Sequence, residues 1–479
     1  MARVGEKRLN MSQEKKEITD EGREKFSNRL GFILISAGCA IGLGNIWRFP
    51  YITGQYGGAA FVLLILLFLV ILGLPILVIE FAVGRASYRS VARSFNALEP
   101  EGTKWHRYKW FALAGNFLLM MFYTTVCGWM IAYLCKMAVG VFNGDADVSG
   151  VFTAMVADPV ELTIWMLVVT GIGFGVCALG VQKGVERVSK IMMAALFVTM
   201  GILCVHSLMM EGGSAGLEFY LIPDFDKLFN NPNASFAQIV YAAISQAFFM
   251  LSIGIGSMSI FGSYIDRSHS LTGEALRVGG LDTLVAIMAG LIIFPACFAF
   301  GVNPDSGPNL VFITLPHVFQ QMPLGQIWGS LFFLFMAFAA LSTVIAVFEN
   351  ILRFAMDQWN ITRKKAIAIM APILIVGSMP CVLGFNVLSG VVVPGIGDIQ
   401  SFEDFLVSNN ILVIGCLIFV LFTVSKRGWG WKNFLEEANK GEGMNFPQWT
   451  YYWVKFGIPI LIIVIFVAGW VPILQTWLG

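Results

Sequence analysis

Apolar segments long enough to cross a lipid bilayer recur along the whole chain and constrain its fold more than any other feature. We place about eleven of them, each of roughly twenty residues or more, near residues 30–54, 59–83, 110–140, 158–181, 188–210, 236–264, 274–301, 325–357, 366–385, 403–425 and 452–476. The composition agrees, because 57% of the residues are hydrophobic and 13% are charged. Backbone groups in lipid must hydrogen-bond within their own segment, which favours helices. The sequence therefore predicts an all-α polytopic membrane protein.

Lysine and arginine gather in alternate connections between these segments. Eight of them lie in residues 1–29, whereas the connections 141–157, 211–235, 302–324 and 386–402 together contain Lys227 alone. Positively charged connections stay on the cytoplasmic side. We therefore expect residues 1–29 to be a cytoplasmic segment of an inner (plasma) membrane protein, with the C-terminus outside because the number of spans is odd. The net charge of +1 gives no reason to expect a nucleic-acid partner.

The first apolar segment is interrupted by residues that do not suit a lipid-facing helix. Between residues 38 and 50 it holds three glycines together with Asn45, Arg48 and Pro50. Glycines alone would favour close helix packing. Polar and charged side chains at membrane depth instead favour a cavity lined by protein, where carbonyl groups freed by a helix break can coordinate a cation. We interpret this stretch as part of a binding site.

The sixth apolar segment repeats the interruption, with glycines at the end of the run from Gln246 to Gly256. Interrupted first and sixth segments are typical of a transporter built from two inverted five-helix repeats, with its site at the membrane midplane. We expect the first repeat at residues 30–210 and the second at 236–427. An extracellular loop at 211–235 would separate them, and a cytoplasmic loop with the final span would occupy 428–479.

These motifs resemble those of the neurotransmitter:sodium symporter family, and the resemblance extends over about residues 23–440. The eleven segments resemble its bacterial amino-acid transporter branch. The resemblance implies uptake coupled to sodium by alternating access. It rests on Gly38-x-x-x-Gly42-Leu43-Gly44-Asn45-x-x-Arg48-Phe49-Pro50, the Gly57-Gly58 turn, Phe248-Phe249 with Ser252 and Gly254, Ile313-Thr314-Leu315-Pro316, and the hydroxyl pair Ser342-Thr343.

The resemblance also implies two sodium sites and no organic cofactor. The second site would use carbonyl groups and the two hydroxyls, at Gly38, Ile41, Ala339, Ser342 and Thr343. The first would use the substrate carboxylate together with Ala40, Asn45, Met250 and Asp282.

Two positions of the first site depart from the family pattern. Met250 stands where a serine or threonine is usual, and Asp282 stands where an asparagine is expected. A thioether is a poor sodium ligand, so we expect Met250 to offer its carbonyl and Asp282 to supply a full negative charge.

Chloride-dependent relatives bind their anion through a tyrosine, a glutamine and two serines. The matching positions here are Ile65, Gln246, Met250 and Ala286, which keep only the glutamine. We therefore expect chloride independence, with Asp282 providing the compensating charge.

The substrate class follows from the same resemblance. Gly42 stands where monoamine transporters carry an aspartate, which leaves room for a substrate carboxylate. The pocket carries no charged side chain, so we expect a neutral, apolar L-amino acid. We expect the transporter to accept several such amino acids, because one methylene group changes the discrimination between substrates by only about 1–3 kcal/mol. The expected binding residues are Ala40, Gly42, Leu43, Gly44, Leu119, Tyr123, Phe249, Ser252, Ile255, Ser342, Thr343 and Val347.

Two gates follow from the resemblance. Arg48 and Asp404 would pair through water outside the site, above Phe249. Arg23 and Asp357, helped by Tyr264, would close the cytoplasmic side.

Other functions stay open at this point. A proton-coupled amino-acid transporter of the same fold is possible, in which Asp282 titrates instead of binding sodium. A channel or a transporter-like sensor is a further alternative. An enzyme is not expected, because the apolar segments carry no nucleophile–base pair and no metal-ligand cluster.

Overall fold

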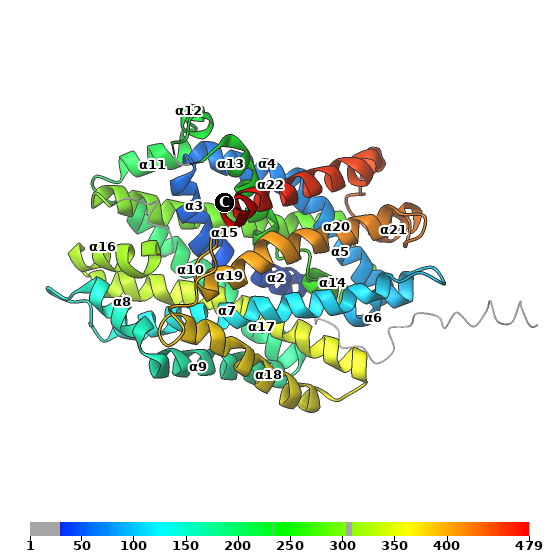
Figure 1. Ribbon diagram of the computed structural model, residues 1–479, viewed down its shortest axis with the longest axis horizontal. Helices are drawn as coiled ribbons and strands as arrows, with labels where there is room; N and C mark the ends of the chain where they lie inside the picture. Colours follow the sequence, from blue (N-terminus) through cyan, green and yellow to red (C-terminus); the bar gives the residue numbers. More distant parts are fainter. Residues whose placement is uncertain (1–28, 233, 303–308, 479) are drawn as a thin grey trace, which may run out of the picture.

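The computed structural model describes residues 29–232, 234–302 and 309–478. In this part of the chain the secondary structure is helical, and β-structure is limited to two isolated bridges, between His269 and Glu442 and between Val393 and Gly397. Figure 1 shows the long helices lying side by side along the longest axis of the molecule. This confirms the all-α expectation.

Nine helices among the described residues are long and apolar enough to cross a membrane. They are Ala59–Ser87 (α4, η2 and α5), Trp105–Ala138 (chiefly α7, Tyr108–Ala138), Pro159–Ala178 (α9), Val181–Leu208 (η4 and α10), Leu271–Ala299 (α15), Gly325–Trp359 (α17), Arg363–Gly384 (α18), Ile399–Val424 (α19, η6 and α20) and Gln448–Leu478, which ends in α22 (Ile458–Leu478).

The two remaining expected segments are broken helices. The first is α2 (Arg29–Ala40) followed by η1 and α3, which together cover Gly44–Gln55 and bend away from α2 by 53°. The second is α13 (Phe236–Met250) followed by α14 (Ser257–Gly262), each too short to cross a membrane alone. Length and composition therefore support nine spans, or ten with the bent pair, so the expected total of eleven is not confirmed.

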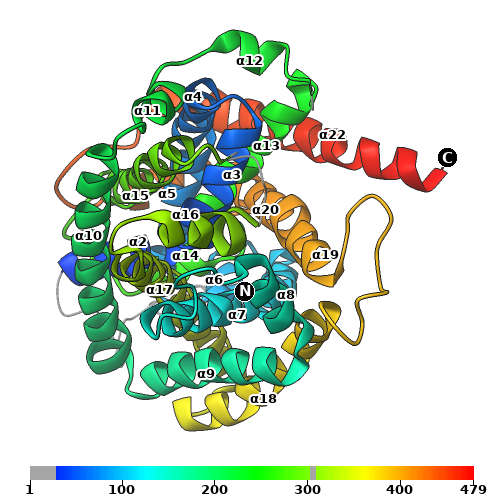
Figure 2. The same ribbon diagram turned by 90° about the vertical axis from the view of Figure 1, so that its left-hand side faces the viewer.

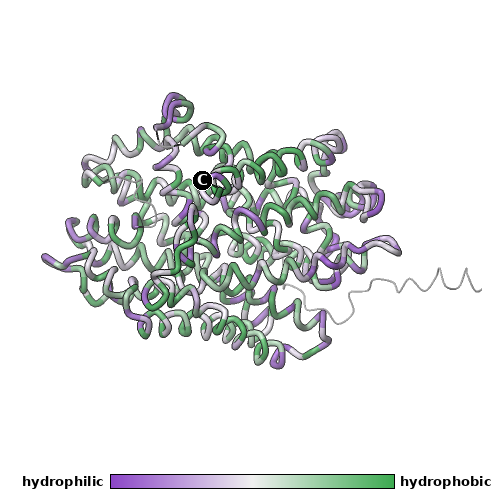
Figure 3. Tube along the Cα trace, in the orientation of Figure 1, coloured by the Kyte–Doolittle hydropathy of each residue, from purple (hydrophilic) through white to green (hydrophobic). Residues whose placement is uncertain are grey.

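Short helices connect the long ones at the two ends of the bundle. One end carries α8 (Val148–Ala157), α11 (Ser214–Leu221), α12 (Phe225–Phe229) and α16 (Leu315–Gln321), and the other carries α6 (Val91–Leu98) and α21 (Trp431–Ala438). Figure 2 looks onto the first of these ends. Hydrophilic residues gather towards both ends and hydrophobic residues fill the middle (Figure 3). This distribution is that of an integral membrane protein.

The helices α7 and α17 form the centre of the bundle. The most apolar window of α17 is 83% buried and that of α7 is 72% buried, whereas the corresponding windows of α18 and α22 are 33% and 29% buried. The helices α18 and α22 therefore lie at the periphery, where lipid would cover them. Any site for a polar ligand is expected near the central pair.

The helices α5 (Leu74–Ser87) and α14 pack backbone against backbone. A Cβ atom at Gly84 would overlap the Ser259 carbonyl, and one at Gly262 would overlap the Phe81 carbonyl. Each glycine thus removes a side chain where the other helix presents a carbonyl oxygen, which lets the two helices approach closely.

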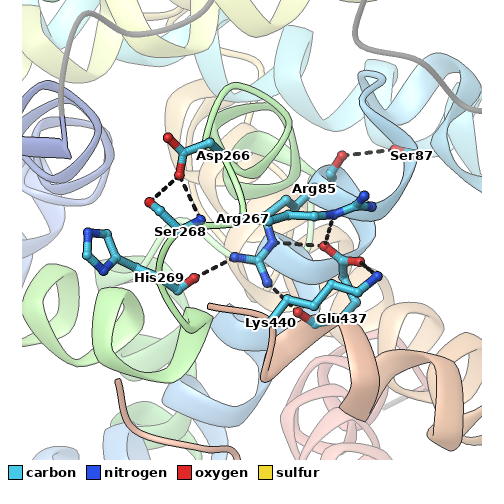
Figure 4. A network of polar contacts seen from close by, with 9 residues as sticks. Arg85, Ser87, Asp266, Arg267, Ser268, His269, Glu437 and Lys440 are labelled. Atoms are coloured by element: carbon cyan, nitrogen blue, oxygen red, sulfur yellow. Dashed lines mark hydrogen bonds and ion pairs between the residues drawn. The ribbon is translucent and has the colours of Figure 1, made fainter. Parts of the chain in front are cut away.

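An ion network fixes α21 at one end of the bundle (Figure 4). The Glu437 carboxylate accepts from Arg85 Nε at 2.9 Å, from Arg267 Nε at 3.0 Å and from Lys440 Nζ at 3.0 Å. Arg85 also donates to the His269 carbonyl at 2.7 Å. Burial alone would raise the pKa of Glu437, but the neighbouring cations, Arg85 foremost, hold this pKa below its ordinary value. The network ties α21 to α5 and to the loop before α15.

Candidate functional site

The break in the first segment opens the backbone next to the central helices. The helix α2 ends at Ala40, and regular structure resumes after Ile41 and Gly42 with the π-helical turn η1 (Gly44–Arg48). Tyr123 on α7 accepts a hydrogen bond from the Leu43 N–H at 2.9 Å. The broken backbone is thus held by side chains from a neighbouring helix, as a break at membrane depth requires.

The break in the sixth segment lies between α13 and α14, at residues 251–256. Gly254 has a φ of 97° and Gly256 a φ of 76°, which glycine adopts at little cost. Ser252 also has a positive φ, of 50°, which is strained for a residue with a side chain. The Glu80 carboxylate accepts the Gly254 N–H, and Tyr108 donates to the Gly254 carbonyl. Buried polar groups therefore satisfy the interrupted backbone.

A small cavity lies between the two breaks. Leu412 at the start of α20 (Leu412–Val424) contributes to it, although no pattern in the sequence pointed to this residue. The expected residues Leu43, Ser342 and Val347 are buried close to α2 or on α17 but do not line it. The lining consists of Ala40, Gly42, Gly44, Leu119, Tyr123, Phe249, Ser252, Ile255, Thr343 and Leu412.

Glycine at position 42 keeps the polar end of this cavity open. A Cβ atom there would overlap the Tyr123 hydroxyl and would lie 2.5 Å from Thr343 Oγ1. At the next glycine, Gly44, a Cβ atom would lie 2.6 Å from the Phe249 ring. The backbone at Gly42 and Gly44 therefore lines the cavity without side chains of its own and in close contact with Tyr123, Thr343 and Phe249.

The five residues expected to form the second sodium site lie together between α2 and α17. Ser342 Oγ lies 2.9 Å from the Gly38 carbonyl oxygen and 2.8 Å from that of Ala339. Thr343 Oγ1 lies 3.2 Å from the Gly38 carbonyl oxygen and 3.3 Å from that of Ile41. We call this the hydroxyl cluster.

A second group of oxygen atoms lies beside the first break. Asn45 Nδ2 donates to Asp282 Oδ1 at 2.8 Å and to the Asp282 carbonyl at 3.0 Å, and both side chains are fully buried. Gln246 Nε2 donates to the Gly44 carbonyl at 2.7 Å. Asn45 Oδ1, Asp282 Oδ2 and Gln246 Oε1 have no hydrogen-bond partner in the described part of the chain. Unpaired buried oxygen atoms are costly unless something positive binds them. We call Asn45, Asp282 and Gln246 the amide–carboxylate cluster.

The other residues expected with this cluster lie nearby. Ala40 lines the cavity. The buried Met250 is the last residue of α13, and its Cα atom lies 3.8 Å from the position that a Cβ atom at Gly44 would occupy. The positions expected to have lost their anion-binding groups, Ile65 and Ala286, are buried and apolar.

A vestibule of about 300 Å³ adjoins the cavity, and Phe249 lines both. Arg48 and Asp404, which were expected to gate this side, both line the vestibule. The Arg48 guanidinium carbon lies 5.2 Å from the centre of the Phe249 ring, within cation–π range. Asp404 accepts from Ser408 Oγ at 2.7 Å, and no ion pair joins Asp404 to Arg48 among the contacts of the described residues.

The side that was expected to face the cytoplasm differs in part from expectation. Tyr264 donates to Glu349 Oε1 at 3.2 Å, and Glu349 also forms an ion pair with Arg363. Asp357 pairs with Arg353 at 3.2 Å and accepts the Ser90 N–H at 2.9 Å. Arg23, the expected partner of Asp357, lies outside the described residues. Sequence reasoning did not find the role of Glu349, because its partners are far away in the sequence.

Comparison with known proteins places the chain in a family. The model of the sodium:neurotransmitter symporter family matches residues 23–141 and 151–476. The sodium-dependent transporter YhdH of Bacillus subtilis is 34% identical over 456 residues, which cover 94% of this chain and 98% of YhdH. A sodium-dependent transporter of Haemophilus influenzae is 30% identical, with 93% and 98% covered.

A solved structure supports the same family assignment. The crystal structure of MhsT in complex with L-phenylalanine superposes with a TM-score of 0.84 at 37% sequence identity, and the match covers 93% of this chain and 100% of that one. The chain therefore belongs to the sodium:neurotransmitter symporter family and is a sodium-dependent membrane transporter.

Proposed function

We propose that the protein imports neutral, apolar L-amino acids together with sodium by alternating access. The observation that carries this proposal is the placement of the cavity between two helix breaks, with the hydroxyl cluster and the amide–carboxylate cluster beside it. Alternating access in such folds works around a fixed central site.

The two oxygen clusters suit sodium as a transported ion. The hydroxyl cluster offers neutral hard oxygen atoms, and broken backbone supplies its carbonyl groups. The amide–carboxylate cluster offers the unpaired Asn45 and Asp282 oxygen atoms and one negative charge. Met250 would add its carbonyl there, and Ala40 another. A sodium ion at the amide–carboxylate cluster would satisfy oxygen atoms that burial otherwise leaves without a partner.

An amino acid suits the cavity. Its carboxylate would approach the side-chain-free backbone at Gly42 and Gly44 and the Tyr123 hydroxyl, next to the amide–carboxylate cluster. Its amino group would meet carbonyl groups of the breaks, such as those of Ala40 and Phe249. The far end is lined by aliphatic side chains without charge, which favours an apolar substrate. The relative MhsT was solved with L-phenylalanine, which supports this class.

Coupling would arise because the substrate carboxylate completes the first sodium site. Each ligand then raises the affinity for the other, and the coupling is reciprocal. The membrane potential would add about 2.3 kcal/mol per charge per 100 mV to inward transport.

Transport is proposed to be independent of chloride. Asp282 would supply a negative charge beside Asn45, and the apolar Ile65 and Ala286 offer no donor to an anion. The charge that chloride brings in other members would be redundant here.

We further propose that Arg48, Asp404 and Phe249 form the outer gate, and that Asp357 and Tyr264 belong to the cytoplasmic one. The N-terminus would then lie in the cytoplasm and the C-terminus outside, with the two inverted repeats at residues 30–210 and 236–427.

Binding of labelled leucine, tryptophan and tyrosine to the purified protein over a sodium titration tests the proposal, with chloride replaced by gluconate. Sodium-dependent binding without chloride is the expected result. Binding that depends on pH but not on sodium would instead favour proton coupling through Asp282, and chloride-stimulated binding would contradict the role given to its charge.

A further inference from the structure

Leu412 forms a wall of the cavity and was not among the residues expected from the sequence. It is 2% exposed and lines the cavity with Leu119 of α7 and Ile255 of the second break. All three are aliphatic side chains, of the kind that would contact an apolar substrate side chain. Leu412 comes from α20, far away in the sequence from the others.

The position of Leu412 is fixed by backbone contacts. A Cβ atom at Gly254 would overlap the Leu412 carbonyl, and a Cβ atom at Gly415 would overlap the Gly254 carbonyl. The start of α20 therefore rests directly on the second break, with no side chain between them. Because densely packed backbone cannot yield as a flexible side chain does, Leu412 has little freedom to withdraw from a bulky ligand.

The surroundings of this wall are equally tight. A Cβ atom at Gly115, one turn before Leu119 on α7, would lie 2.5 Å from an Ile411 methyl group and 2.9 Å from an Ile255 methyl group. Ile255 and Ile411, the neighbour of Leu412, thus pack closely against the α7 backbone at Gly115. The space for a substrate side chain depends on the size of the residues that face it.

The segment that carries Leu412 also carries a vestibule residue. Asp404 lies two turns earlier in the Ile399–Val424 helix and lines the vestibule, which Phe249 separates from the cavity. A substrate that does not fit against Leu412 would push on the same helix that presents Asp404. Selection of the substrate by size and closure of the vestibule would then involve the same helix, Ile399–Val424.

We propose that Leu412 determines the size of the amino-acid side chain that the transporter accepts. This inference rests on the proposed function, because it concerns the same cavity. A smaller residue at position 412 would admit bulkier aromatic side chains, and a larger one would restrict the site to small substrates. One methylene group in such a pocket changes discrimination by about 10- to 200-fold.

The test is uptake into proteoliposomes under an inward sodium gradient, with labelled valine, leucine and tryptophan. The wild type, Leu412→Ala and Leu412→Phe are compared by the ratios of kcat/KM between substrates. Leu421→Ala is the matched control, because Leu421 lies on the same helix but is 37% exposed on its outer face. Leu412→Val replaces Leu412→Ala if the latter fails to fold.

We expect Leu412→Ala to shift the tryptophan-to-valine ratio by about tenfold or more towards tryptophan, and Leu412→Phe to shift it towards valine. Leu421→Ala should leave the ratio unchanged. Ratios within twofold of wild type in both position-412 variants, with uptake still driven by sodium, would overturn the inference and leave the proposed function standing. A wild type that takes up none of the three amino acids would overturn both.

Discussion

Replacing Asp282 with asparagine isolates the charge that we assign to the first sodium site. The substitution keeps the shape of the side chain and an oxygen that can accept from Asn45 Nδ2, which lies 2.8 Å from Asp282 Oδ1 in the wild type. A cation bound to the unpaired Asn45 oxygen would lie about 4 Å from the carboxylate. At an effective dielectric constant of about 20, that separation gives about 4 kcal/mol.

This attraction is an upper limit for the measured effect. It corresponds to nearly a thousandfold in sodium affinity, and part of it offsets the cost of burying the carboxylate. We therefore expect Asp282→Asn to raise the sodium concentration for half-maximal amino-acid binding by at least about tenfold. Equilibrium binding of labelled leucine over a sodium titration measures this shift.

The control is the same change at Asp147, which caps α8 through the Gly150 N–H at 2.9 Å. Asparagine caps a helix equally well, so Asp147→Asn should leave the sodium titration unchanged. An unaltered sodium titration in Asp282→Asn would refute the assignment of the charge. If its binding lost a pH dependence instead, the proton-coupled alternative would gain support.

Three further variants test separate features of the structure. Gly42→Ala should reduce amino-acid binding more than about tenfold, because its Cβ would overlap the Tyr123 hydroxyl; Gly175→Ala, where a Cβ meets open space, should bind normally, and equal binding by both would contradict the reasoning. Tyr123→Phe removes the hydroxyl that accepts a backbone N–H at 2.9 Å and should weaken amino-acid binding by about 1–3 kcal/mol. Isothermal titration calorimetry measures this loss. A loss smaller than the scatter between wild-type measurements would show that the hydroxyl is dispensable. Because the pKa of Glu437 is held below its ordinary value, its ion network stabilises the fold above about pH 4 and loses that contribution as pH falls through the lowered pKa. Glu437→Gln should therefore lower the apparent melting temperature at pH 7, by an amount that shrinks towards acid pH, whereas the neighbouring exposed Glu436→Gln should not.

The broken segments could be predicted because glycines and polar residues are anomalous in lipid-length apolar runs. Both breaks lie within the predicted stretches, at residues 41–43 and 251–256. The contact of Ser342 and Thr343 with the first break could be predicted only from the family motifs. Nothing local in the sequence brings together residues that lie about 300 positions apart.

Other features of the structure could not be predicted from the sequence. Leu412 is an ordinary leucine in an apolar segment, and only the packing of α20 on Gly254 shows that it lines the cavity. The number of spans could not be read from apolar length, because the second break leaves α13 and α14 individually too short. The hydrogen bond from Tyr264 to Glu349 depends on tertiary packing between helices that no pattern relates.

The close contact between α5 and α14 has a practical consequence for measuring conformational change. Because Gly84 and Gly262 each face a carbonyl group of the opposite helix, the two helices cannot slide or turn past one another without collision. We therefore expect α14 to move together with α5. A pair of spin labels placed across this contact should report the same distance whether or not sodium is present, and can serve as an internal ruler for movements elsewhere.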